Sequence, residues 1–360
     1  MAMQSESRVV DVDMQAIASR ALAGSPADLG EIQRALVNGL LPLTREALEL
    51  FLAHLKTPSN GKNSRLRLVE TAFRDLTLVL ITRENLFNPD TSIISAISNS
   101  WPAICSSLVE LYGHHKDLAI KVSRPPAGQK HQVMDVPSVI LTFIETISHW
   151  PDISTTLQVP CQLQQVTTIF ASIWTGELTR GATRLDFSAS ETLASFISCR
   201  EGDARLGTSF IERFDSKPVL TKLLLGHLET SCKSQASYLG SDALLIGFLI
   251  EVDPDLKGYL LSQSSTRKFI AALKWFVGQT PSPEIVNSLA VCLKCLVEAT
   301  DGVTWVKQVL RANILPALSS FYHYKAVENK AIILLSQTLS RYLVYKSVLR
   351  ETRYSLDDMI

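Results

Sequence analysis

The sequence predicts an all-α protein, an α-solenoid of stacked helix pairs, and three observations support this prediction. Apolar residues recur at helical spacing along most of the 360 residues, whereas sustained alternation with a period of two is scarce. Prolines recur near the ends of these apolar segments, where a helix tolerates them. Segments such as 220–229 and 243–250 are apolar nearly all round. Such a helix needs neighbours on two flanks, as in stacked helix arrays.

Composition permits a large core and argues against a general affinity for polyanions. Hydrophobic residues make up 46% of the chain and charged residues 19%. Lys plus Arg number 35 and Asp plus Glu number 35, so the formal net charge is zero. A protein that binds nucleic acid usually has a basic excess. Nucleic acid is therefore not the expected partner, and any such role would need a local basic patch.

No membrane span or secretory signal is predicted. The apolar run 243–250 is far shorter than the roughly 20 residues that cross a bilayer. Residues 1–15 carry charges throughout and contain no apolar core segment. Six cysteines, at positions 105, 161, 199, 232, 292 and 295, do not make a disulfide framework in a chain of this length. We therefore expect an intracellular protein, cytoplasmic or nuclear, with buried thiols.

The first helices have recognisable ends. Ser25-Pro26 predicts a helix start, as do Lys217-Pro218 and Ser282-Pro283 further along. Asn38-Gly39 could form a hairpin turn. The residues before it are helix-spaced, however, so we interpret this glycine as a helix C-cap. Thr44 can cap the next helix, whose inward residues are predicted to be Ala47, Leu48, Phe51, Leu52 and Leu55. Residues 65–83 repeat the pattern.

One segment interrupts the helical pattern. Residues 121–137 contain three prolines, one glycine and no periodicity. We expect a flexible, solvated surface loop there, with a hinge between two half-arrays as the alternative. The predicted organisation is a disordered N-terminus (1–10), a single helical-repeat domain (11–352) and a tail (353–360). In all, the chain should form roughly 14 to 18 helices.

Internal repetition is faint but present. Segments 100–113 and 149–160 share Trp-Pro-x-Ile at a lag of 49 residues, a little above the roughly 40 to 47 of HEAT and armadillo units. Residues 302–321 look like an armadillo-type step, with a tight turn at Ala312-Asn313 and with Leu315 and Leu318 directed inward. Asparagine replaces the usual glycine in that turn and is the next best residue for a left-handed conformation.

The C-terminal segment combines an apolar stripe with basic residues. Six apolar or aromatic residues are spaced for one helical stripe: Ile332, Leu335, Leu339, Tyr342, Tyr345 and Leu349. The same predicted last helix carries a basic cluster, Arg341, Lys346, Arg350 and Arg353. The cluster could meet an acidic partner or phosphates, but a solvated helix face is the favoured interpretation.

No residue set predicts catalysis, cofactor binding or metal binding. Cys292 and Cys295 fall on the apolar side of a predicted helix, without the second pair that a zinc site needs and away from a helix N-terminus. We therefore interpret them as core thiols. His227 fits a core or edge position better than a ligand. Phosphate-binding loops and a nucleophile elbow are missing. Capping explains paired carboxylates such as Asp253 and Asp255.

The C-terminal residues 325–356 resemble a known group of proteins. The segment LSRYLVYKSVLR, Leu339–Arg350, is similar to the helical region that precedes the MYND-type zinc finger in proteins of mushroom-forming fungi. That resemblance implies an all-helical region used beside a Cys/His-rich finger for protein contacts. The sequence departs from the pattern because no finger follows the matched segment, so no zinc ligand is carried over. The resemblance therefore implies one of two alternatives. Either the finger is encoded in the reading frame beyond Ile360, or this protein is a paralogue that lacks the finger.

These observations predict a non-enzymatic protein-interaction scaffold or adaptor. Continuous helical patterning without a convergent catalytic set is their common basis. The alternatives are a helical-repeat protein that binds nucleic acid through a basic face, and an enzyme whose site has no local motif. The expected partners are other proteins.

Overall fold

The computed structural model is helical throughout the part of the chain that it describes. This part comprises residues 14–57, 63–82, 90–121, 136–148, 150, 160–180, 189–198, 204–234, 236–277, 303–323 and 330–357. Every regular element in these ranges is an α-helix or a short 3-10 helix, and none is a strand. The predicted all-α class is confirmed. The chain divides into two compact units, Met1–Phe170 and Ala171–Ile360, with the division inside α8 (Pro160–Arg180).

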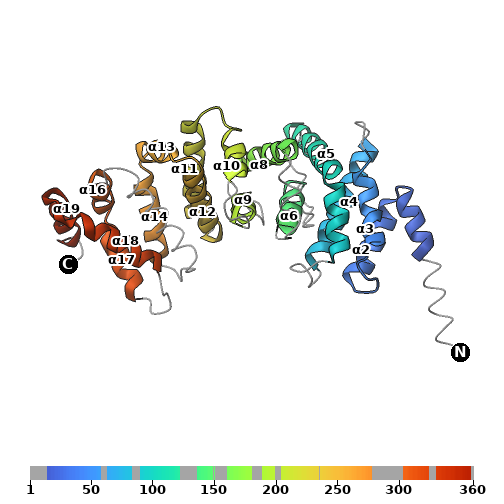
Figure 1. Ribbon diagram of the computed structural model, residues 1–360, viewed down its shortest axis with the longest axis horizontal. Helices are drawn as coiled ribbons and strands as arrows, with labels where there is room; N and C mark the ends of the chain where they lie inside the picture. Colours follow the sequence, from blue (N-terminus) through green and yellow to red (C-terminus); the bar gives the residue numbers. More distant parts are fainter. Residues whose placement is uncertain are drawn as a thin grey trace. The chain divides into compact units, whose positions relative to one another are not determined.

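The first unit consists of helices that pack on near neighbours in the chain (Figure 1). They are α2 (Pro26–Val37), α3 (Arg45–Leu55), α4 (Asn63–Thr82), α5 (Thr91–Lys121) and α6 (Val136–Ser148), and residues 14–22 are helical as well. Helix α4 packs on α2 and α6, while α3 packs on α4 and α5. Alternate helices thus form two layers, which is the packing of an α-solenoid.

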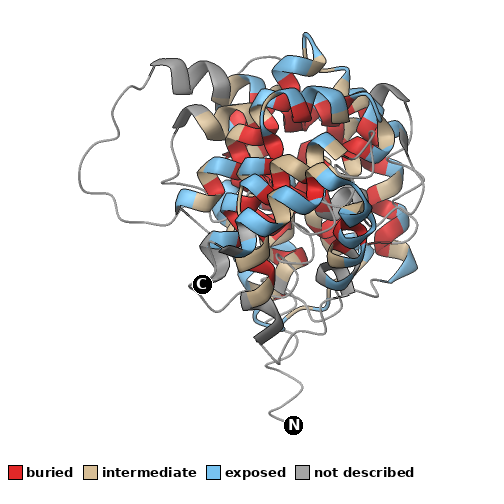
Figure 2. Cartoon of the chain, turned by 90° about the vertical axis from the view of Figure 1, so that its left-hand side faces the viewer, coloured by how far each residue is buried: buried red, intermediate tan, exposed pale blue. Residues whose placement is uncertain are grey.

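Helix α6 shows why neighbours are needed on both flanks. Every residue from Val136 to Ile144 is buried. Phe143 packs edge-on against Phe73 of α4, with ring centroids 5.4 Å apart. The hydroxyl of Thr142 donates to the carbonyl of Ser138 at 2.8 Å, so this polar residue needs no water. In Figure 2 the described helices carry buried residues on one side and exposed residues on the other.

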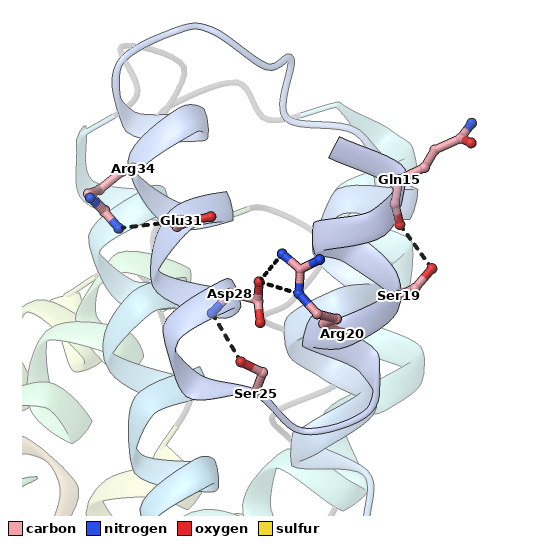
Figure 3. Close-up of polar contacts among 7 residues, drawn as sticks. All are labelled: Gln15, Ser19, Arg20, Ser25, Asp28, Glu31 and Arg34. Atoms are coloured by element: carbon pink, nitrogen blue, oxygen red, sulfur yellow. Dashed lines mark hydrogen bonds and ion pairs between the residues drawn. The ribbon is translucent and has the colours of Figure 1, made fainter. Parts of the chain in front are cut away.

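The N-terminal helix ends confirm the predicted capping. Ser25 accepts a hydrogen bond from the Asp28 amide at 3.4 Å, and Arg20 donates two hydrogen bonds to the Asp28 carboxylate at 2.7 and 3.0 Å (Figure 3). Gly39 has φ +74° and follows the α2 C-cap, as expected for a glycine that ends a helix. Thr44 accepts a hydrogen bond from the Ala47 amide at 3.3 Å at the start of α3.

The described helices of the second unit come in groups that open with a short helix. They are α9 (Ala189–Ser198), α10 (Ala204–Ile211), α11 (Lys217–Ser234), α12 (Ala236–Val252), α13 (Leu256–Ser262), α14 (Ser265–Val277), α16 (Val303–Arg311), α17 (Ile314–His323), α18 (Lys330–Arg341) and α19 (Lys346–Asp357). The short α10 precedes α11 and α12, and the short α13 precedes α14. Armadillo-like groups have this order, so the predicted fold class holds for this unit.

A spacing of about 49 residues recurs in the second unit. Helices α11, α14 and α17 begin at Lys217, Ser265 and Ile314, so successive starts lie 48 and 49 residues apart. Their core positions repeat at 49 residues, and all three residues are buried: Leu220, Phe269 and Leu318. The lag matches that between the two Trp-Pro-x-Ile segments.

The predicted turn between α16 and α17 is confirmed. Asn313 has φ 59°, in the left-handed region, and its amide donates to the Leu310 carbonyl at 2.8 Å. Leu318 is buried and Leu315 is half-buried.

The prediction of one continuous C-terminal helix stripe is wrong. Helix α18 ends at Arg341, a 3-10 turn covers Tyr342–Val344, Tyr345 is extended, and α19 begins at Lys346. Among the stripe residues whose side chains are described, Leu335 and Leu339 are buried, whereas Tyr345 and Leu349 are about half exposed. The apolar residues of the sequence keep their helical spacing across this turn, although the α-helix itself is interrupted there. Helix α19 also continues to Asp357, so residues 353–357 of the expected tail are helical. The Thr352 hydroxyl, which donates to the Val348 carbonyl, lies inside that helix.

Several predictions concern residues outside the described ranges. They are the disordered residues 1–10, the loop between Lys121 and Val136, the helix start at Ser282-Pro283, and the cysteines at 292 and 295.

Two glycine substitutions separate backbone conformation from packing. An added Cβ meets nothing within 4 Å at either Gly39 or Gly30. Gly39→Ala should lower local stability at the end of α2 by about 1 kcal/mol, because an alanine at φ +74° is strained. Gly30→Ala, inside α2, should raise stability by about 0.5–1 kcal/mol. Native-state hydrogen exchange of peptides from α2 measures both changes, and equal signs would contradict the capping role of Gly39.

Candidate functional site

A buried polar cluster links the helices of the second unit. The indole nitrogen of Trp174, on α8, donates to the Ser190 hydroxyl of α9 at 2.9 Å. His227, on α11, lies over the Trp174 ring with centroids 4.2 Å apart, and its Nε2 lies 2.9 Å from the Trp174 carbonyl. Because that carbonyl can only accept, Nε2 carries the proton. On the next turn of α11, Ser231 donates to the Asp242 carboxylate of α12 at 2.5 Å.

The two titratable groups of this cluster have strongly shifted pKa values. Burial lowers the pKa of His227 to about 4, and the hydrogen bond with the Trp174 carbonyl only partly opposes the shift. Burial raises the pKa of Asp242 to about 6, although hydrogen bonds from Ser190 and Ser231 favour the carboxylate. Both side chains are buried. The dominant cause is the same in both cases: a charge is poorly solvated inside the helix stack.

This cluster fits a structural role better than a catalytic one. Its hydrogen bonds run between helices and join Trp174, Ser190, His227, Ser231 and Asp242, all of them buried. A nucleophile or general base must reach a substrate, and these atoms already bind one another. The predicted core position of His227 is confirmed. The carboxylate of Asp242 was not predicted, because its serine partners lie on other turns and helices.

The paired carboxylates and the Cys232 thiol also lie in structural environments. Asp253 and Asp255, predicted as simple caps, both bind the Lys217 ammonium, at 2.8 and 2.9 Å. This ion pair connects the start of α11 with the segment between α12 and α13. Burial raises the pKa of the Cys232 thiol to about 12, with Asp242 and Glu229 adding to the shift. A thiol of that pKa is a poor nucleophile.

The part of the chain that the structure describes contains neither a metal site nor a helix that could span a membrane. None of the groupings of His, Cys, Asp and Glu in the described ranges is arranged to hold a metal ion. In the same ranges, every helix is too short or too polar to cross a membrane.

A further candidate among the described residues is a groove at the end of the second unit. It has a volume of about 470 Å³ and lies between α16, α17, α18, α19 and the turn before α19. We call this pocket the C-terminal groove; its lining residues are Val306, Leu310, Leu315, Leu318, Ser319, Ser336, Leu339, Ser340, Leu343, Thr352 and Leu356. The floor is aliphatic and the only polar lining atoms are backbone groups and hydroxyls, so the groove suits apolar side chains.

Apolar side chains continue from the C-terminal groove onto the surface. Leu343 and Leu356 line the groove and are 37% and 47% exposed. Nearby in sequence, Val344 is 80% exposed and Leu349 is 50% exposed. Exposed apolar side chains beside a concave pocket are typical of a binding site for another protein.

Comparisons with known proteins give only weak structural similarities. No known protein family matches the chain, and no curated protein matches it. Among solved structures, a designed armadillo repeat protein is similar with a TM-score of 0.48 at 11% sequence identity, over 82% of this chain and 99% of that chain. An engineered protein gives a TM-score of 0.39 at 12% identity, over 96% and 95%. Both similarities are too weak to support a function, so the fold assignment depends on helix packing within each unit.

The shifted pKa values of His227 and Asp242 predict two opposite contributions to the pH dependence of stability. The lowered pKa of His227 makes stability fall as the pH drops from about 6.5 to about 4, because the unfolded chain takes up the proton first. The raised pKa of Asp242 has the opposite effect on stability. The contribution of Asp242 to the free energy of unfolding is complete below pH 3.8 and is lost as the pH rises through about 6. The two effects nearly cancel in the wild-type chain.

Single substitutions should therefore reveal each effect. Asp242→Asn leaves only the histidine effect, so the free energy of unfolding of α11 and α12 should fall by on the order of 3 kcal/mol between pH 6.5 and pH 4. His227→Gln should show a slope of opposite sign over that range. Native-state hydrogen exchange of peptides from α11 and α12 gives both profiles. Parallel profiles in the two variants would show that these groups do not titrate as described.

Proposed function

We propose that this chain is a non-enzymatic protein-interaction scaffold or adaptor that holds a partner protein in the C-terminal groove. The groove itself is the observation that supports the proposal: it is a concave, aliphatic surface of about 470 Å³ with exposed leucines on its rim. Stacked helices offer such surfaces while each helix remains supported by its neighbours.

The lining of the C-terminal groove favours binding over catalysis. A reaction centre needs titratable or nucleophilic groups that converge on a substrate. The lining consists of valine, leucine, serine and threonine, without a carboxylate, imidazole, amine or thiol. The buried titratable groups of this unit whose pKa values are strongly shifted, His227, Cys232 and Asp242, are not among the lining residues. An aliphatic groove is equally ill-suited to nucleic acid, whose backbone requires charge on the contact surface itself.

The proposal is compatible with the sequence resemblance. Segment Leu339–Arg350, which resembles the helical region before the finger of fungal MYND-finger proteins, covers the end of α18, the turn and the start of α19. It supplies Leu339, Ser340 and Leu343 to the groove. In proteins of that type, the helical region would present this surface beside the zinc finger. A relationship between this chain and the fungal MYND-finger proteins is part of the proposal.

A pair of tryptophan substitutions tests the proposed function. Ser340 is exposed on α18 and lines the C-terminal groove, so Ser340→Trp should fill the groove while leaving the core intact. Lys222→Trp adds the same side chain at an exposed position of α11, a helix that contributes no residue to the lining. Proteins that co-purify with the tagged chain should fall about tenfold or more with Ser340→Trp and persist with Lys222→Trp in quantitative mass spectrometry.

Folding is checked by circular dichroism and thermal melting, which should match for the wild type and both variants. Identical capture by all three proteins would exclude the C-terminal groove as the docking site. A chain without any specific partner, whose melting temperature a small molecule raises strongly, would overturn the scaffold function altogether.

A further inference from the structure

The C-terminal groove lies in the most basic described part of the chain. Within residues 303–323 and 330–357 there are seven basic residues: Lys307, Arg311, Lys330, Arg341, Lys346, Arg350 and Arg353. The acidic residues in the same ranges are Glu351 and Asp357. Glu351 is already bound to Arg311 at 2.6 Å. The chain as a whole is neutral, so this excess of positive charge is local.

The basic side chains border the groove. Arg341 directly follows Ser340, and Arg353 directly follows Thr352, two residues that line it. On α19, Leu349, Arg353 and Leu356 are spaced by four and three residues and therefore form one stripe. Leu356 lines the groove, so Arg353 lies on the flank of α19 that adjoins it. Both arginines are exposed.

This arrangement of charge is unfavourable for α19 itself. Lys346 begins the helix, where the helix dipole disfavours a cation, and the first turn contains no acidic residue. Arg350 follows at a spacing of four, so two like charges face each other along the helix. Arg350 has a favourable electrostatic interaction with Glu351, but the Glu351 carboxylate is bound to Arg311. A charge pattern that opposes folding is typical of a functional surface.

We propose that the C-terminal groove binds an acidic amphipathic helix of a partner protein; this inference depends on the proposed scaffold function. Such a helix places apolar side chains, spaced by three, four and seven residues, into the groove. Carboxylates on its flanks then meet Arg341 and Arg353, which steer the partner to the groove and fix its orientation.

Charge also disfavours the competing occupants. A second copy of this chain, docked groove to groove, would bring the same basic rim against itself. Nucleic acid would use the rim but leave the aliphatic floor exposed. An anionic membrane would contact the exposed leucines and basic residues of α19, but it would not need a concave pocket.

Titration of the full chain with three synthetic helices tests the inference. The acidic probe is a fluorescein-labelled peptide of about 20 residues with leucines on one face and glutamates on the flanks. The basic probe replaces the glutamates with lysines, and the polar probe replaces the leucines with serines. Fluorescence anisotropy should show at least about tenfold tighter binding of the acidic probe than of either other probe. Its affinity should decrease as salt is added.

Charge reversal identifies the rim residues. The double variant Arg341→Glu/Arg353→Glu should bind the acidic probe about tenfold or more weakly than the wild type does. It should also bind the basic probe more tightly than the acidic probe. Lys222→Glu/Arg267→Glu makes the same charge change at exposed positions of α11 and α14 outside the groove and should bind like the wild type. Ser340→Trp should abolish binding of the acidic probe. Matching circular dichroism spectra and melting temperatures show that all variants are folded.

The outcomes separate this inference from the proposed function. Equal binding of acidic and basic probes, acidic binding that survives Ser340→Trp, or self-association that Ser340→Trp abolishes would overturn it. So would binding of single-stranded RNA or of phosphatidylserine vesicles that requires Arg341 and Arg353 while the acidic probe fails. If no probe binds but Ser340→Trp still removes the captured proteins, the inference fails and the scaffold function stands. If both experiments fail, neither proposal survives.

Discussion

A helix that is apolar on two flanks is stable in water only while other helices cover both of them, and most features of this protein follow from that requirement. Helix α6 is the clearest case, since every residue from Val136 to Ile144 is buried and α4 and α5 pack against it. Helix α12 has the same need and packs on α9 and α11. Each helix therefore depends on helices close to it in the chain, and a surface is left wherever that coverage stops.

Burial on two flanks also limits which polar groups the helices can contain. The threonines of α6 bond to carbonyls of the preceding turn, which removes their need for water. Asp242 and His227 cannot do so, and each relies on partners from other helices. Burial destabilises the charged forms of both side chains. Their hydrogen bonds, however, require α8, α9, α11 and α12 to be in register, so they select one packing among several that aliphatic contacts alone would allow.

The C-terminal groove lies where the apolar flanks of the helices are not fully covered by neighbouring helices. Around α18 and α19 the described helices leave leucines partly exposed and bring hydroxyls, not titratable groups, to the floor. The exposed arginines beside it, Arg341 and Arg353, belong to a local excess of positive charge in a chain whose net charge is zero. Apolar area supplies the free energy of association, and surrounding charge selects which partner approaches. A chain built in this way can discriminate among partners without a reaction centre.

The amino-acid sequence by itself determined the fold class and several helix ends, because both depend on residues within a few positions of one another. Helical spacing predicted α3 and α4, Ser25 and Thr44 marked helix starts, and Gly39 and Asn313 marked turns with positive φ. Relations between helices were decided only by the tertiary structure. Spacing in the C-terminal segment could not distinguish one helix from two joined by a turn at Tyr345, since the periodicity continues across the break. Nor could sequence bring Asp242 to Ser231, Lys217 to Asp253, or the residues of five segments to one groove, because those contacts depend on how distant helices pack, not on any local pattern.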